Sequence, residues 1–138
     1  AIGNKIFGCD DCLAICPWNK YAKKTKEIKL NDDKYNFDLM TLLKLSDQSF
    51  RNQFSGSPIK RIGRDRFLRN CCIAAGNSKN RKLVPNLINL LFNDDSSLVR
   101  GAAVWAIQQI GNEQTLSKTK KSHLKLEKET SVIDEWYI

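Results

Sequence analysis

Three cysteines lie within eight residues near the start of the chain, and proline follows the last of them. Their spacing is Cys9-x2-Cys12-x3-Cys16-Pro17. Thiolates bind zinc and iron–sulfur clusters, and a closed site of either kind normally takes four protein ligands. Three thiols in one short loop are therefore one ligand short of a complete site.

The spacing matches the last three cysteines of the bacterial ferredoxin run C-x2-C-x2-C-x3-C-P, with Ile6 where the first cysteine of that run would stand. In such a run the cysteine before proline ligates a different cluster from its neighbours. We therefore predict that Cys9 and Cys12 bind one [4Fe–4S] cluster and that Cys16 binds a second. The missing ligands would then lie upstream of Ala1, in a longer protein.

Zinc and redox chemistry are the alternatives for this loop. A structural zinc site closes with Cys or His ligands in two pairs, but the chain has no second pair at a suitable spacing. Its single histidine, His123, lies in a lysine-rich tail, where we expect it to be solvated. A disulfide that leaves one free thiol is the third possibility. The adjacent Cys71 and Cys72 follow apolar residues, and we expect them to be small buried hydrophobes rather than ligands.

Composition limits the kinds of protein that this chain can be. At 138 residues with 41% hydrophobic residues, the chain can bury one modest core. The odd number of cysteines, five, does not fit a secreted disulfide scaffold. No apolar run approaches the roughly 18 residues that a membrane span needs. We expect a soluble, cytoplasmic protein.

The formal net charge of +8 favours an acidic partner, and nucleic acid is the first candidate. Drawn as one helix, residues 57–75 would bury two cations on the apolar face. We predict instead a turn that starts at Ser57 and Pro58, a break near Gly63, and a main helix from about Asp65 to Ala75. The cations predicted to contact phosphate are Lys60, Arg61, Arg64 and Arg69. The alternative is a merely solvated basic face.

The remaining sequence is helical in pattern. Two short helices are predicted within residues 37–54, with Ser46 as the N-cap of the second. Asn70 is predicted to bind an unpaired carbonyl at the break near Gly63. Apolar stripes follow in residues 83–91 and 99–110, and residues 130–138 are predicted to cap the stack.

Two glycine–asparagine pairs, Gly76-Asn77 and Gly111-Asn112, are interpreted as helix stops. Their separation of 35 residues suits one helix pair of a solenoid. The predicted fold is mainly α, with a ferredoxin-like cluster-binding loop followed by a HEAT-like helical repeat region. Residues 1–35 would form the ferredoxin-like part with a linker, and residues 36–138 the repeat domain.

Three segments together resemble one enzyme family: IGNKIFGCDDCLAICPWNKYA, FSGSPIKRIGRDRFLRN and VRGAAVWAIQQIG. They are similar to the carboxy-terminal part of epoxyqueuosine reductases, the oxidoreductases that reduce epoxyqueuosine to queuosine at the tRNA wobble position. The resemblance implies two [4Fe–4S] clusters ligated by Cys9, Cys12 and Cys16, and cobalamin bound mostly by the upstream part.

The resemblance also implies a tRNA anticodon stem-loop and an electron donor protein as partners, and a monomer as the working form. The catalytic acid would lie upstream, so no catalytic residue is assigned in this chain, which alone would be inactive. The alternative from another class is a non-enzymatic, ferredoxin-type electron-transfer module fused to a HEAT-like protein-interaction domain.

Overall fold

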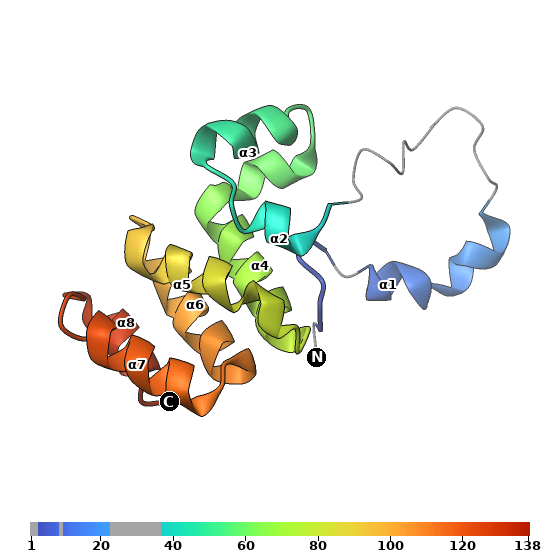
Figure 1. The fold of residues 1–138 in the computed structure, drawn as a ribbon. Coiled ribbons are helices and arrows are strands. Elements are labelled where there is room, and N and C mark those ends of the chain that lie inside the picture. Colours follow the sequence, from blue (N-terminus) through green and yellow to red (C-terminus); the bar gives the residue numbers. More distant parts are fainter. Residues whose placement is uncertain (1–2, 9, 23–36) are drawn as a thin grey trace.

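The computed structural model describes residues 3–8, 10–22 and 37–138 (Figure 1). Within these ranges the chain forms α-helices and short 3-10 helices, and no strand occurs there. The prediction of a mainly α fold is therefore confirmed. The predicted linker falls largely on residues 23–36, which lie outside the described residues.

Five helices form the main body. They are α4 (Arg64–Asn77), α5 (Val84–Asn93), α6 (Ser97–Ile110), α7 (Glu113–His123) and α8 (Thr130–Glu135). Helix α6 is central, because it packs against α4, α5 and α8 (Figure 1). The predicted apolar stripe of α6 is buried except for Ala102, which is half-buried, and Val104 is buried in addition. The buried residues are Val99, Ala103, Val104, Ala106, Ile107 and Ile110.

Helices α4 and α6 approach closely at Gly76. A Cβ atom on Gly76 would lie 2.5 Å from Cζ3 of Trp105 and 3.1 Å from Cα of Ala106. The predicted helix stop at Gly76-Asn77 is confirmed in position, because α4 ends at Asn77 with Ser78 as its C-cap, although Gly76 itself is still helical. Glycine is needed at this position because a side chain would collide with α6, not because the chain turns there.

The second predicted stop is confirmed. Helix α6 ends at Ile110, with Gly111 as its C-cap. Asn112 then caps α7, its side chain accepting a hydrogen bond from the backbone N–H of Thr115 at 2.8 Å. Helix α7 therefore has a defined start.

Two short helices precede the body, as predicted. They are α2 (Leu39–Leu42) and α3 (Asp47–Gln53), and the Ser46 hydroxyl accepts from the backbone N–H of Ser49 to cap α3. Four aromatic rings attach this part to α4, with neighbouring ring centroids 4.9 to 5.9 Å apart: Phe37, Phe50, Phe54 and Phe67.

The predicted break before α4 is also confirmed. A 3-10 helix, η3 (Pro58–Ile62), ends at Gly63, which has φ 79° and ψ 160°. This backbone conformation is one that residues with a side chain rarely adopt. The break turns the chain sharply between η3 and α4, so that Lys60 and Arg61 precede the turn and Arg64 follows it.

The carboxy-terminal residues cover the end of the stack. Val132 and Trp136 are buried, as predicted for the cap. The expectation of a solvated His123 is wrong, because this side chain is only 2% exposed. Trp136 Nε1 donates to His123 Nδ1 at 3.1 Å, and His123 Nε2 lies 3.2 Å from a carboxylate oxygen of Glu127. No helix in the described part of the chain is long and apolar enough to span a membrane.

Candidate functional site

The cysteine loop stands apart from the helical body (Figure 1). It contains α1 (Asp11–Ala14) and the 3-10 helix η1 (Pro17–Tyr21). Cys12 lies on α1 with an exposed thiol, and Cys16 is the N-cap of η1 with a half-buried thiol. Both thiols are free, so neither forms a disulfide.

The third predicted ligand, Cys9, lies outside the described residues. Within the described ranges, no group of three or more His, Cys, Asp or Glu side chains is arranged to hold a metal ion. The thiol chemistry of Cys12 and Cys16, together with their accessibility, fits part of an iron–sulfur ligand set. The assignment of the three cysteines to two clusters stays a prediction.

The cysteine loop exposes apolar side chains to an unusual degree. The exposed fractions reach 83% for Ile15 and 73% for Trp18, and Leu13 and Tyr21 are also exposed. Neighbouring apolar side chains with this exposure usually mark a surface that another group covers. The loop therefore has the character of an interface rather than of a free surface turn.

Two asparagines of α4 hold the segment that leads into the loop. Asn70 Nδ2 donates to the carbonyl oxygen of Ile6 at 2.9 Å, and Asn77 Nδ2 donates to that of Gly3 at 2.8 Å. The prediction that Asn70 binds a carbonyl at the helix break is therefore wrong. Sequence reasoning missed Asn77, although its spacing of seven residues from Asn70 places both side chains on one helix face.

Three of the four predicted phosphate-contacting cations are exposed: Lys60, Arg61 and Arg69. Arg66 on the same helix as Arg69 is exposed too. No structural contact tests whether any of them meets a phosphate. Their position on the surface around the break is what a role in binding an acidic partner requires.

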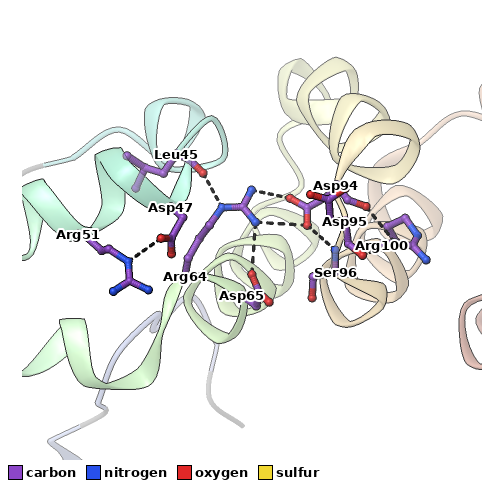
Figure 2. A network of polar contacts seen from close by, with 9 residues as sticks. All are labelled: Leu45, Asp47, Arg51, Arg64, Asp65, Asp94, Asp95, Ser96 and Arg100. Atoms are coloured by element: carbon purple, nitrogen blue, oxygen red, sulfur yellow. Dashed lines mark hydrogen bonds and ion pairs between the residues drawn. The ribbon is translucent and has the colours of Figure 1, made fainter.

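Arg64 differs from the other cations because it is held inside a network (Figure 2). Its Nε donates to the carbonyl oxygen of Leu45 at 2.9 Å, and its Nη2 lies 2.5 Å from Asp94 Oδ2. A weaker contact of 3.3 Å joins Nη1 to Asp65. The Arg64 side chain is 18% exposed and that of Asp94 only 2%.

The expectation that the bend keeps Arg64 out of the core is therefore wrong. Arg64 is the first residue of α4, and the bend at Gly63 directs it back toward the residues before α3 and α6. Asp94 is fixed from its other side, because Oδ1 accepts from the backbone N–H of Ser96 at 3.0 Å. Arg64 thus connects the start of α4 with the residues before α3 and before α6. The predicted contact of Arg64 with phosphate stays a prediction.

Cys71 and Cys72 are both fully buried, as predicted for small hydrophobes. Burial raises the pKa of the Cys71 thiol far above its ordinary value. Burial and, to a smaller extent, the charge of Asp94 raise the pKa of Cys72 to about 12. Both thiols are therefore protonated at neutral pH, which suits small buried side chains of the core.

Two surface cavities meet at α4. One, of about 420 Å³, lies between the segment that leads into the cysteine loop and the cations of α4. Its lining residues are Ile6, Phe7, Gly8, Ile62, Arg66, Arg69, Asn70 and Leu98. The other, of about 470 Å³, lies between α4, α6 and α8 and includes Trp105. Arg69 and Leu98 line both. The surface next to the cysteine loop is thus hollowed and basic.

Comparison with known proteins places these features in a family context. Residues 63–122 match the family model for HEAT repeats. The chain is 42% identical over 113 residues to the epoxyqueuosine reductase of Xanthomonas campestris, an alignment that covers 80% of this chain and 32% of that protein. It is 35% identical over 112 residues to the epoxyqueuosine reductase of Pseudomonas aeruginosa, covering 80% of this chain and 31% of that protein.

Solved structures agree with these sequence matches. The epoxyqueuosine reductase of Bacillus subtilis matches with a TM-score of 0.88 and 28% identity, over 99% of this chain and 37% of that one. A structure of epoxyqueuosine reductase with a tRNA-Tyr epoxyqueuosine-modified tRNA stem loop matches equally well, with a TM-score of 0.88, 28% identity and cover of 99% of this chain and 36% of that one.

This chain spans about a third of the length of the curated relatives that it matches. The structural match includes the cysteine loop as well as the HEAT-like helices, since it extends over 99% of the chain. The resemblance predicted from three sequence segments is confirmed: in sequence and in fold, the chain is similar to one part of the epoxyqueuosine reductases.

Proposed function

We propose that this chain is the cluster-binding and tRNA-facing part of an enzyme that reduces epoxyqueuosine to queuosine in tRNA. The observation that carries the proposal is the structural match over 99% of the chain to an epoxyqueuosine reductase solved with a modified tRNA stem loop. The whole enzyme would be an oxidoreductase that includes about twice as much additional chain, as its relatives do.

In this proposal Cys9 and Cys12 ligate one [4Fe–4S] cluster and Cys16 ligates a second. The support is the ferredoxin-like spacing together with the free, accessible thiols of Cys12 and Cys16. When bound, the clusters and cobalamin would supply the electrons for the reduction. The part played by the cysteine loop is to hold the clusters at a fixed place.

The basic surface around the helix break would bind the phosphates of the tRNA anticodon stem-loop. Lys60, Arg61 and Arg69 are proposed to make these contacts, and the exposed Arg66 joins them. Arg64 was predicted to belong to the same set. Because its side chain is bonded to Leu45 and Asp94, we propose that it mainly stabilises the bend before α4. Phosphate contacts of this kind position the RNA without reading its sequence.

Further parts of the proposal rest on the family alone. Residues 1–35 would complete a two-cluster ferredoxin-like domain with the upstream chain, and residues 36–138 would form the HEAT-like domain. The enzyme would act as a monomer in the cytoplasm and take electrons from a donor protein. No residue of this chain is proposed as the catalytic acid.

The test uses the full-length protein that contains this chain. Purified protein, cobalamin and a chemical reductant are incubated with tRNA that carries epoxyqueuosine. The tRNA is then digested to nucleosides, which are separated and identified by mass spectrometry. Conversion of epoxyqueuosine to the product that lacks one oxygen atom supports the proposal. Protein that binds iron and carries electrons but leaves epoxyqueuosine unchanged would favour the electron-transfer module instead.

A further inference from the structure

We infer that Asn70 and Asn77 are positioning residues, which fix the cysteine loop at a set distance from the basic surface of the HEAT-like helices. The inference rests on the proposed function, because it concerns how two parts of one enzyme site are held together. Neither asparagine would touch a cluster or the tRNA. Each would act through the backbone segment that leads into the cysteine loop.

The two asparagines reach both ends of the segment from Gly3 to Ile6. Seven residues of an α-helix make almost two full turns, so both side chains lie on one face of α4. Gly3 lies in a turn and Ile6 in a bend, three residues apart in the chain. One amide therefore meets one carbonyl at each end, at 2.8 Å and 2.9 Å.

The fixed segment is directly connected to the cluster ligands. Ile6 packs partly buried against the hydrophobic core, and it lies three residues before Cys9. Lys5, between the two bonded carbonyls, forms an ion pair with Asp11, the residue before Cys12. A shift of this segment along α4 would therefore displace the cysteine loop as well.

The same helix carries the cations. Arg66 and Arg69 lie on α4 near Asn70. All three line one cavity together with residues 6–8, which lead into the cysteine loop. The opposite face of α4 is anchored in the core by buried residues: Phe67, Leu68, Cys71, Ala74 and Ala75. One rigid helix thus sets the separation between the cluster loop and the proposed phosphate contacts.

The amide group is what the two contacts require. A carbonyl oxygen only accepts hydrogen bonds, so Asn70 and Asn77 must present their Nδ2 donors. Aspartate has almost the same shape as asparagine but carries only acceptors when ionised, so Asn70→Asp and Asn77→Asp replace attraction by repulsion. Asn89→Asp is the matched control, because Asn89 uses its oxygen to accept from Asn93, and aspartate retains that oxygen.

The first measurement is the rate of tryptic cleavage after Lys5 in the folded full-length protein, followed by mass spectrometry. Cleavage there requires the segment to leave α4, and its rate follows the population of the open form when opening is fast. Two hydrogen bonds of ordinary strength change such an equilibrium by roughly 10- to 30-fold. We expect that increase for Asn70→Asp with Asn77→Asp, a smaller one for Asn77→Asp alone, and none for Asn89→Asp.

The second measurement separates positioning from simple structural support. The double variant should keep its iron content, whereas its kcat at saturating tRNA should fall by about tenfold or more, because misplacement of reacting groups is costly. The new carboxylate at position 70 lies beside Arg69, whose Nη1 donates to Asn70 at 3.3 Å, so a weaker tRNA affinity is expected too and kcat is the readout that decides. Asn77 is exposed, so Asn77→Asp cannot unfold the core and keeps the test valid if the double variant is unstable.

Three results would count against these ideas, each in a different way. Cleavage after Lys5 at the rate of Asn89→Asp would overturn the docking of the segment. Faster cleavage with unchanged kcat would overturn the positioning role. A wild-type protein that shows the protection but never reduces epoxyqueuosine would refute the proposed function, and the positioning role with it, while the docking itself would stand.

Discussion

The ion pair between Arg64 and Asp94 should be a principal source of stability at the bend before α4. Substitution of Asp94 by alanine removes a contact of 2.5 Å to Arg64 and the acceptor of the Ser96 backbone N–H. Breaking a buried ion pair costs about 3 to 5 kcal/mol. Because Arg64 is still 18% exposed and keeps its bond to the Leu45 carbonyl, we expect about 2 to 4 kcal/mol for Asp94→Ala.

A double-mutant cycle isolates the interaction. Arg64→Ala, Asp94→Ala and the double variant should give a coupling energy of about 1 to 3 kcal/mol. The matched control is the pair of Arg51 and Asp47, whose side chains are 61% and 57% exposed. That exposed pair should couple by at most about 0.5 kcal/mol. Both pairs are visible in Figure 2.

The assay is native-state hydrogen exchange of the amides of α4 and α6 in the full-length protein, which reports the free energy of local opening. If the Arg64 pair couples as weakly as the Arg51 pair, the physical reasoning about burial is refuted. The same result would mean that the Arg64 side chain is free to contact phosphate, like the exposed cations near it.

Other predictions concern RNA binding, pH and packing. Arg61→Ala with Arg69→Ala should weaken binding of the tRNA stem-loop and flatten its log–log salt dependence by roughly one to two units, whereas an unchanged slope in a salt titration would mark a solvated face. Burial lowers the pKa of His123, so the unfolded state binds more protons than the folded state between the ordinary pKa of about 6.5 and the lowered one; stability should fall as the pH drops below about 6.5 and level off once the pH is below the lowered pKa, and His123→Asn should flatten the dependence of the melting temperature on pH. Gly76→Ala should cost about 1 to 3 kcal/mol, because the methyl group would displace the Trp105 ring, and a melting temperature equal to wild type would disprove that contact.

Local sequence signals predicted much of the fold. Ser46 as a cap, the break at Gly63 and the burial of Trp136 depend on residues a few positions away, so the pattern of the nearby sequence determines them. Helical periodicity likewise identified the apolar stripe of α6, because that stripe lies on one face of one helix.

The errors arose where distant residues decide the structure. Arg64 is bound to Asp94, thirty residues further along the chain, and no local pattern reports that pairing. Helix α4 does end next to Gly76, but the close approach of α6, which the local sequence does not report, is what requires a glycine there. The lysines around His123 indicated solvent, but Trp136 and Glu127 enclose that ring.

The candidate site was predictable in its residue types but not in its connections. Spacing identified the cysteines, and charge identified Lys60, Arg61 and Arg69. The bonds from Asn70 and Asn77 to Ile6 and Gly3 join residues more than sixty positions apart. Such contacts depend on the tertiary fold, which places the first described residues of the chain beside a helix that lies much later in the sequence.

The several tasks of α4 restrict how its length can change. An insertion or deletion of one residue inside the helix would rotate everything beyond it by about 100° and shift it by about 1.5 Å. An insertion between Phe67 and Asn70 would turn the asparagines away from the cysteine loop and also move Gly76 from beneath Trp105. The turn that follows, around Lys79 with its φ of 56°, has no such restriction. Length variation among natural relatives should therefore fall in that turn, while the interior of α4 keeps a constant number of residues.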